Sequence, residues 1–204
     1  MTDASATPTR DVPAAARAVL DFWFGPPDDP EHLNSRKPWF VKDPAFDALI
    51  AQRFGATLEQ ALNGALDAWA AAPLSALARL IVLDQFTRNV FRGTPRAFAG
   101  DARALAAAQA LVASGADLGL TGVQRQFTYL PFEHAEDVQL QLESLRLFER
   151  LAIDHPALHD LPRWAQAHHD IVARFGRFPH RNAILGRDST AEEIAFLQTP
   201  GSAF

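Results

Sequence analysis

The 204-residue chain contains no cysteine and only one methionine and one tyrosine. The absence of cysteine excludes disulfide bonds, thiolate catalysis, cysteine-ligated zinc and iron–sulfur clusters. Apolar runs are also short: residues 70–83 are interrupted by Pro73 and Arg79. A helix that crosses a bilayer needs a run of about 18 apolar residues, so we expect no membrane segment. The polar N-terminus lacks the apolar core of a signal peptide, which makes the cytoplasm the expected location.

Lysine is nearly absent, since the 19 basic residues are 17 arginines together with Lys37 and Lys42. The formal net charge is −5, which argues against nucleic acid as a partner but permits a local basic pocket. A GC-rich genome accounts for part of such an arginine excess. An arginine that binds a carboxylate or phosphate bidentately, however, is not replaceable by lysine. Arginines close to acidic and amide residues are therefore candidates for a binding site.

Residues typical of β-strands are scarce, and no alternating apolar run predicts a strand. Valine, isoleucine and threonine together number 25, against 38 alanines and 24 leucines, which favour helices. The sequence predicts an all-α protein of about eight or nine antiparallel helices with short connections and no sheet. We expect one domain over residues 11–198, with loose ends at 1–10 and 199–204.

Proline, glycine and capping residues predict the helix boundaries. Asp43 before a proline is typical of a helix start. Thr121 with Gln124, and Ser189 with Glu192, have the form of capping boxes. The expected helices run over residues 11–22, 44–69, 73–90 and 101–113, from 121, and over 131–153, 162–175 and 189–197.

Residues 77–92 form the first candidate segment, a helix that is apolar around nearly its whole circumference and is therefore expected to be buried. Asp84, Arg88 and Arg92 share one arc of about 80° on this helix. Buried charges need partners, because their desolvation costs several kcal/mol. Together with Gln85 and Asn89, these residues indicate an internal polar cavity. The alternative is that the arc is the solvent-exposed face of the helix.

Residues 127–137 form the second candidate segment. If Pro131 opens a helix, Glu133, His134 and Glu136 lie in its first turn, where the helix dipole favours carboxylates. His134 then leads an apolar stripe and points inward, which makes it a candidate general base or metal ligand. The alternatives are a structural, hydrogen-bonded histidine and a plain capping role for the two glutamates.

Residues 174–182 form the third candidate segment, a helix end followed by an aromatic and basic loop. The loop contains Arg177, His180, Arg181 and Asn182, and loops shaped by glycine and proline often carry function. Arginine forks in this loop would hold a carboxylate or phosphate. The alternatives are compensation of a helix dipole, pairing with surface acids, and a nucleic-acid patch, which the net acidity disfavours.

The remaining sequence features are weaker indications of a functional site. Trp23 and Trp39 would form either an aromatic wall for a ligand or part of the core. His155 and His159 are four residues apart, but a proline between them predicts a loop. Metalloprotease, phosphate-loop, dinucleotide-binding and serine-hydrolase motifs are absent from the sequence, so we expect neither a metal nor another cofactor.

Five stretches of sequence carry a family resemblance: LDFWFG, RKPWF, LDQFTRNVFRGTPRAFAGDARA, LPFEHAEDVQLQ and ARFGRFPHRNAILGR. They resemble the DUF924 family, a bacterial family of unknown function that also occurs in some fungi. The resemblance covers residues 16–198 and implies a tetratricopeptide-like all-α fold, but no reaction, substrate or cofactor. The positions that match the family motifs are Trp23, Trp39, Asp84, Gln85, Arg88, Asn89, Arg92, Glu133, His134, Glu136, Arg177, His180, Arg181 and Asn182.

Two functional hypotheses follow. In the first, the three segments converge in a helix-lined pocket that binds a small anionic ligand and, in the case of an enzyme, performs acid–base chemistry. In the second, a tetratricopeptide-like interaction module binds an acidic peptide or a C-terminal carboxylate in an arginine-rich groove. The sequence assigns no oligomeric state. For the first hypothesis, the catalytic candidates are Glu133, His134 and His180, and the ligand-binding candidates are Trp39, Asp84, Gln85, Arg88, Asn89, Arg92, Glu136, Arg177, Arg181 and Asn182.

Overall fold

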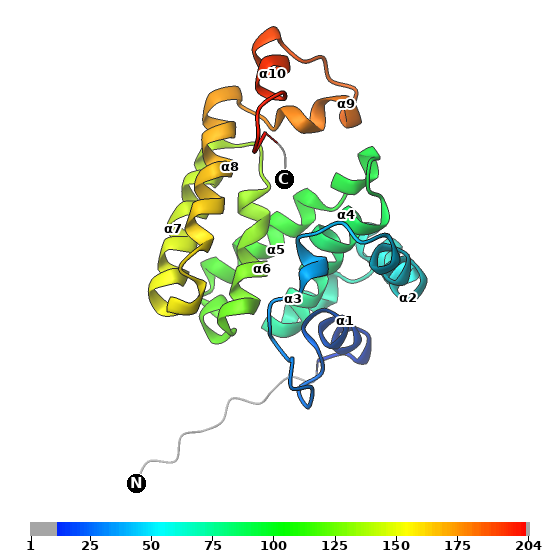
Figure 1. Cartoon of the computed structure of the whole chain (residues 1–204). Coiled ribbons are helices and arrows are strands. Elements are labelled where there is room, and N and C mark those ends of the chain that lie inside the picture. The colour runs from blue at the N-terminus through cyan, green and yellow to red at the C-terminus, as the bar shows by residue number, and fades with distance from the viewer. Residues whose placement is uncertain (1–11, 203–204) are drawn as a thin grey trace.

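The computed structural model describes residues 12–202, and every regular element in this range is helical (Figure 1). The prediction of an all-α fold is confirmed, since the described residues contain no strand. None of the helices in this range is long and apolar enough to cross a membrane. The helices are α1 (Ala14–Phe24), α2 (Pro44–Leu62), α3 (Pro73–Ile81), α4 (Thr87–Val90), α5 (Asp101–Ala113), α6 (Gly122–Glu133), α7 (Val138–Asp154), α8 (Leu161–Phe175), α9 (Asn182–Leu185) and α10 (Ala191–Phe196).

Helix α3 is buried from Ser75 to Ile81 and contacts α1, α5 and α6. Helices α6, α7 and α8 follow one another along one side, and each packs against the next (Figure 1). The short helices α9 and α10 lie at the end of the molecule where α8 terminates (Figure 1).

Aromatic side chains form the core between α1, α2 and α6. The rings of Trp23 and Trp39 are stacked, with centroids 5.7 Å apart and an interplanar angle of 20°. Phe127 meets the Trp39 ring edge-on at 4.8 Å. Trp39 is 9% exposed, so this tryptophan packs in the core and does not form the wall of a ligand site.

Two predicted helix starts are confirmed. Asp43 caps α2 by accepting hydrogen bonds from the backbone N–H groups of Ala45 and Phe46 at 2.9 and 3.1 Å. Thr121 and Gln124 form the expected capping box at the start of α6. Side-chain caps of this kind satisfy N–H groups that the first helical turn leaves free.

The prediction that Pro131 opens a helix is wrong, because Pro131 lies inside α6, two residues before its end. The next helix starts only at Val138, where Asp137 accepts hydrogen bonds from two backbone N–H groups at 2.8 and 3.1 Å. Proline close to a helix end removes one intrahelical hydrogen bond without stopping the helix. Glu133 and His134 consequently lie at the C-terminal end of α6, and Glu136 lies in the connection to α7.

The C-terminal capping box is displaced by one residue from the predicted one. Thr190 Oγ1 accepts from the N–H of Glu193, and Glu193 Oε2 accepts from the N–H of Thr190. Ser202, which lies in the expected loose end 199–204, is buried at 8% exposure. Residues 1–11 and 203–204, which include the predicted start of the first helix and the expected N-terminal end, lie outside the described part of the chain.

The predicted helix 73–90 is continuous but contains a π-helical turn, Val82–Phe86, between α3 and α4. All residues of this turn are buried. Gly100 packs directly against it, since a Cβ on Gly100 would lie 2.0 Å from the carbonyl oxygen of Leu83. This close approach, which only glycine allows, places the start of α5 beside the π-helical turn. Such turns occur frequently at functional sites.

Candidate functional site

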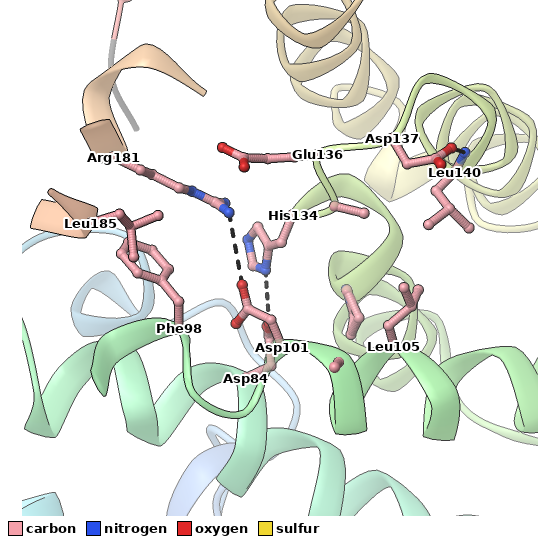
Figure 2. A pocket seen from close by; sticks show the side chains of 13 residues that line it. Asp84, Phe98, Asp101, Leu105, His134, Glu136, Asp137, Leu140, Arg181 and Leu185 are labelled. Atoms are coloured by element: carbon pink, nitrogen blue, oxygen red, sulfur yellow. Dashed lines mark hydrogen bonds and ion pairs between the residues drawn. The ribbon is translucent and has the colours of Figure 1, made fainter. Parts of the chain in front are cut away.

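A cavity of about 330 Å³ lies where the π-helical turn, α5, the end of α6 and the 3₁₀ turn Pro179–Arg181 meet (Figure 2). Its volume falls in the lower part of the range of small-molecule pockets. Its polar lining consists of Asp84, Asp101, His134, Glu136, Asp137 and Arg181, and its apolar lining of Phe98, Ala102, Leu105, Pro131, Ala135, Leu140 and Leu185.

Asp84 is the fully buried centre of the polar lining. Its Oδ1 lies 2.8 Å from His134 Nδ1 and 3.0 Å from an Arg88 guanidinium nitrogen. Gln85 donates a hydrogen bond of 2.6 Å to Oδ2. Burial alone would raise the pKa of Asp84, but the charge of Arg88 and the His134 contact overcome it and hold the pKa below its usual value. Asp84 therefore stays ionised in the interior.

Arg88 lies between two carboxylates. Besides Asp84, it binds both oxygens of Asp101, at 2.9 and 3.2 Å. The same guanidinium donates to the backbone carbonyl of Asp84 at 2.8 Å. Arg88, a predicted ligand-binding residue, is thus already occupied by the protein and holds α4 against the start of α5.

His134 is oriented by Asp84. A carboxylate can only accept, so Nδ1 carries the hydrogen of this contact. Burial, followed by the charge of Arg88, lowers the pKa of His134, although Asp84 opposes the shift. The ring is consequently neutral at neutral pH and its Nε2 is unprotonated. Figure 2 shows the ring between Asp84 and Arg181. An aspartate that fixes the tautomer of a histidine is the arrangement that prepares Nε2 as a general base.

Arg181 is a buried cation of this site that has no carboxylate at hydrogen-bonding distance among residues 12–202. It is 7% exposed, and its guanidinium carbon lies 4.8 Å from the centre of the Phe98 ring and 4.4 Å from that of Phe178. Its nearest carboxylate oxygen, on Asp101, is 3.7 Å away, which is too long for a hydrogen bond. Its Nε is buried and has no hydrogen-bond partner among residues 12–202. Burial, followed by the charge of Arg88, lowers the pKa of Arg181 to about 10, which leaves it charged at neutral pH.

Glu133 and His168 form a second buried pair, and neither residue lines the cavity. Glu133 Oε1 lies 3.1 Å from His168 Nδ1, which also lies 2.9 Å from the carbonyl oxygen of Trp164. Burial, with a contribution from the charge of Asp84, raises the pKa of Glu133 to about 8. Burial lowers the pKa of His168 to about 3. Both groups are therefore uncharged at neutral pH, and Glu133, a predicted catalytic residue, is not part of the cavity wall.

Glu136 is held by Arg187, a residue that the sequence interpretation left out of the site. The two guanidinium nitrogens of Arg187 lie 2.5 and 2.8 Å from the two Glu136 oxygens. The N–H of Phe178 donates to Oε1 at 2.8 Å. Burial would raise the pKa of Glu136, but these hydrogen bonds lower it. Glu136 therefore lines the cavity as an ionised, fully bonded carboxylate.

Two other predicted residues, Asn89 and Arg92, are directed to a different part of the molecule. Both bind Asp47 on α2: Asn89 donates at 2.7 Å, and Arg92 donates at 2.9 and 3.0 Å. These contacts link α2 to the residues around the end of α4, and neither side chain lines the cavity.

Three of the four predicted residues of the loop 174–182 lie outside the cavity wall. Arg177 forms two hydrogen bonds with Glu193, at 2.6 and 2.8 Å, and does not face the cavity. Asn182 bonds to Ser189 and Arg187. His180 is also absent from the cavity wall; burial, followed by the charge of Arg181, lowers its pKa to about 4. Of the four predicted loop residues, only Arg181 reaches the cavity.

Asp101, Phe98 and Phe178 are site residues that the sequence interpretation missed. Asp101 and Phe98 lie within one of the stretches that carry the family resemblance, and this is the sequence signal that would have selected them. Over residues 12–202, no group of three histidine, aspartate or glutamate side chains is arranged to hold a metal ion.

The fold and cavity define an all-α protein with a buried cluster of aspartate, histidine and arginine at a junction of helices. The chain belongs to the DUF924 family, described as bacterial proteins of unknown function, whose model matches residues 19–201. It is similar to the solved structure of a protein of unknown function from Agrobacterium tumefaciens, with 39% sequence identity and a TM-score of 0.77. This similarity covers 92% of this chain and 99% of the other. No curated protein matches the chain.

Proposed function

We propose that the cavity binds a small anionic ligand through Arg181 and that His134, oriented by Asp84, acts on this ligand as a general base. The observation that carries the proposal is the environment of Arg181, a buried cation that donates no side-chain hydrogen bond to the residues described. A buried charge without hydrogen bonds is costly. A bound anion would supply the missing acceptors.

The pairing of the other charges supports this assignment. Asp84 shares Arg88 with Asp101, and Glu136 is paired with Arg187. Asp101 is bound by Arg88 at hydrogen-bonding distance and lies farther from Arg181. Arg181 is thus the cation of the cavity wall with hydrogen-bond donors left for a ligand.

The chemistry of the lining favours direct acid–base catalysis. No serine or threonine occurs among the residues that line the cavity in the described part of the chain, so His134 has no hydroxyl nucleophile to activate there. Its Nε2 would instead take a proton from water or from the ligand, and Asp84 would stabilise the imidazolium that forms. Hydrolysis and isomerisation both suit this arrangement.

The alternative of an acidic-peptide groove has less support. It requires several arginines that are free to bind carboxylates, but Arg88 and Arg177 are paired with Asp101 and Glu193. A cavity of about 330 Å³ also suits a small molecule better than a length of peptide.

A thermal-shift screen with small organic and inorganic anions tests the proposal. A ligand that binds only the folded protein raises its stability by about 2.7 kcal/mol at 100 times its Kd. We expect wild type and Arg92→Gln, a matched arginine outside the cavity, to be stabilised, and Arg181→Gln not to be. In contrast, His134→Gln is expected to retain binding and lose turnover. Equal stabilisation of wild type and Arg181→Gln by every anion that binds would refute the site.

A further inference from the structure

Apolar residues line the cavity on both sides of His134. Figure 2 places Arg181 on one side of His134, with Phe98 and Leu185, and it places Leu105 and Leu140 on the other side, with Asp137 next to Leu140. Leu105 belongs to α5 and Leu140 to α7, and both line the cavity with side chains that are partly exposed. A ligand whose charged group binds Arg181 therefore has an apolar surface available to the rest of its structure.

The environment of Arg181 favours a single negative charge. The carboxylate of Asp101 lies 3.7 Å from the guanidinium, and the ionised side chains of Asp84 and Glu136 also line the cavity. These charges repel a dianion more strongly than a monoanion. In the lining formed by the described residues, a phosphate dianion would find one cation with free donors and four carboxylates, those of Asp84, Asp101, Glu136 and Asp137.

The geometry of Arg181 favours a planar anion. Phe98 and Phe178 lie against the guanidinium, with their ring centres 4.8 and 4.4 Å from its central carbon. Contacts to the ring faces leave the donors at the edge of the guanidinium plane for a ligand. Two parallel N–H groups along such an edge match the two oxygens of a carboxylate.

We infer that the ligand of this cavity is a small monocarboxylic acid with an aliphatic body, its carboxylate on Arg181 and its carbon chain against Leu105 and Leu140. This inference rests on the proposed anion site at Arg181 and specifies its ligand class. Because His134 lies between Arg181 and the two leucines (Figure 2), the general base would face the part of the ligand next to its carboxyl group.

Isothermal titration of the full chain with acetate, butanoate and hexanoate tests this class directly. Each buried methylene is expected to lower the Kd about fourfold. Hexanamide, which lacks the charge, and inorganic phosphate are expected to bind at least about tenfold more weakly than hexanoate. This series uses the wild-type protein, so it does not depend on whether any variant folds.

Two variants of α7 test where the carbon chain lies. Leu140→Asn is expected to weaken hexanoate binding and to leave acetate binding nearly unchanged. Leu142→Asn is the matched control, because Leu142 is 46% exposed and does not line the cavity, and it is expected to bind hexanoate like wild type. Circular dichroism verifies that both variants fold.

The outcomes separate the two proposals. If phosphate binds as tightly as hexanoate, and if Arg181→Gln loses this binding, the monocarboxylate class would be overturned but the anion site would be kept. Affinity that does not rise with chain length, or hexanoate binding that Leu140→Asn leaves intact, would also overturn the class. If none of these anions binds in an Arg181-dependent manner, the monocarboxylate class is overturned, and the wider anion screen then decides the site itself.

Discussion

Two polar clusters are formed by side chains of residues 84–92, and they differ in how deeply they are buried. Asp84 and Arg88 face α5 and α6, where Asp84 is fully buried. Asn89 and Arg92 follow within one helical turn and bind Asp47 on α2, and the Arg92 side chain is 39% exposed. Both clusters join carboxylates to arginines at hydrogen-bonding distance, so the chemistry of the contacts is the same.

The two clusters differ in their access to water. Water reaches the Arg92 side chain, which is 39% exposed, and part of Asp47, which is 15% exposed, but it does not reach Asp84, which is 0% exposed. Exposed ion pairs therefore contribute little to stability, whereas a buried charge that loses its partner destabilises the fold strongly. The following predictions test this contrast, from the largest expected effect to the smallest.

Asp84→Ala is expected to have the largest effect. The substitution removes one of the two carboxylates that hold Arg88, the acceptor of His134 and that of Gln85. We expect a loss of about 3–5 kcal/mol in the free energy of unfolding, measured by urea denaturation. A loss below about 1 kcal/mol would show that the buried cluster behaves like a surface one.

Glu133 is expected to make stability depend on pH. Its pKa is about 8 in the folded protein, against 4.5 for an ordinary glutamate. The folded state therefore keeps a proton that the unfolded state releases, and stability falls as the pH rises from about 4.5 to about 8, by at most about 1.4 kcal/mol per pH unit. Glu133→Gln should remove this decline.

Urea denaturation between pH 6.5 and 8.5 provides the measurement for Glu133. The buried His168 has the opposite sign: its pKa is about 3, against 6.5 for an ordinary histidine, so its contribution is lost as the pH falls from about 6.5 to about 3. The chosen range avoids that contribution. Parallel curves for wild type and Glu133→Gln would contradict a protonated Glu133.

Arg181 and Arg177, only four residues apart, are expected to respond in opposite ways without ligand. Arg181→Gln removes a buried cation that donates no side-chain hydrogen bond within residues 12–202, so we expect a free energy of unfolding within about 1 kcal/mol of wild type or above it. Arg177→Gln leaves the buried Glu193 without the two hydrogen bonds that Arg177 donates and should lower the melting temperature. A clear loss of stability in Arg181→Gln would indicate a structural role for Arg181.

Arg92→Ala is expected to have the smallest effect, a loss of about 0.2–1 kcal/mol that shrinks as salt is added. Denaturation at low and high ionic strength measures it. A loss as large as that of Asp84→Ala, or one insensitive to salt, would abolish the distinction between the exposed and buried clusters.

Part of the site was predictable because it depends on helix periodicity. The apolar circumference of residues 77–92 indicated correctly that Asp84 is buried and needs partners. The sequence also predicts an inward-facing His134, but in the first turn of a helix, whereas His134 lies at the C-terminal end of α6. Asp137, not Pro131, starts the next helix, α7, because a side-chain cap supplies hydrogen bonds that a proline cannot.

Helices, their caps and their buried faces follow from residues a few positions apart, and for this reason the sequence was sufficient to predict an all-α protein. Which partner each charged side chain binds, in contrast, depends on contacts between segments that are distant in the sequence. Arg88, Arg177 and Arg181 are equivalent candidates in the sequence. In the folded chain Arg88 binds Asp101 and Arg177 binds Glu193. Arg181 is buried between aromatic rings and has no hydrogen-bonded partner in the part of the chain that the structure describes. That allocation, which no local pattern encodes, turns one arginine into the centre of a candidate site.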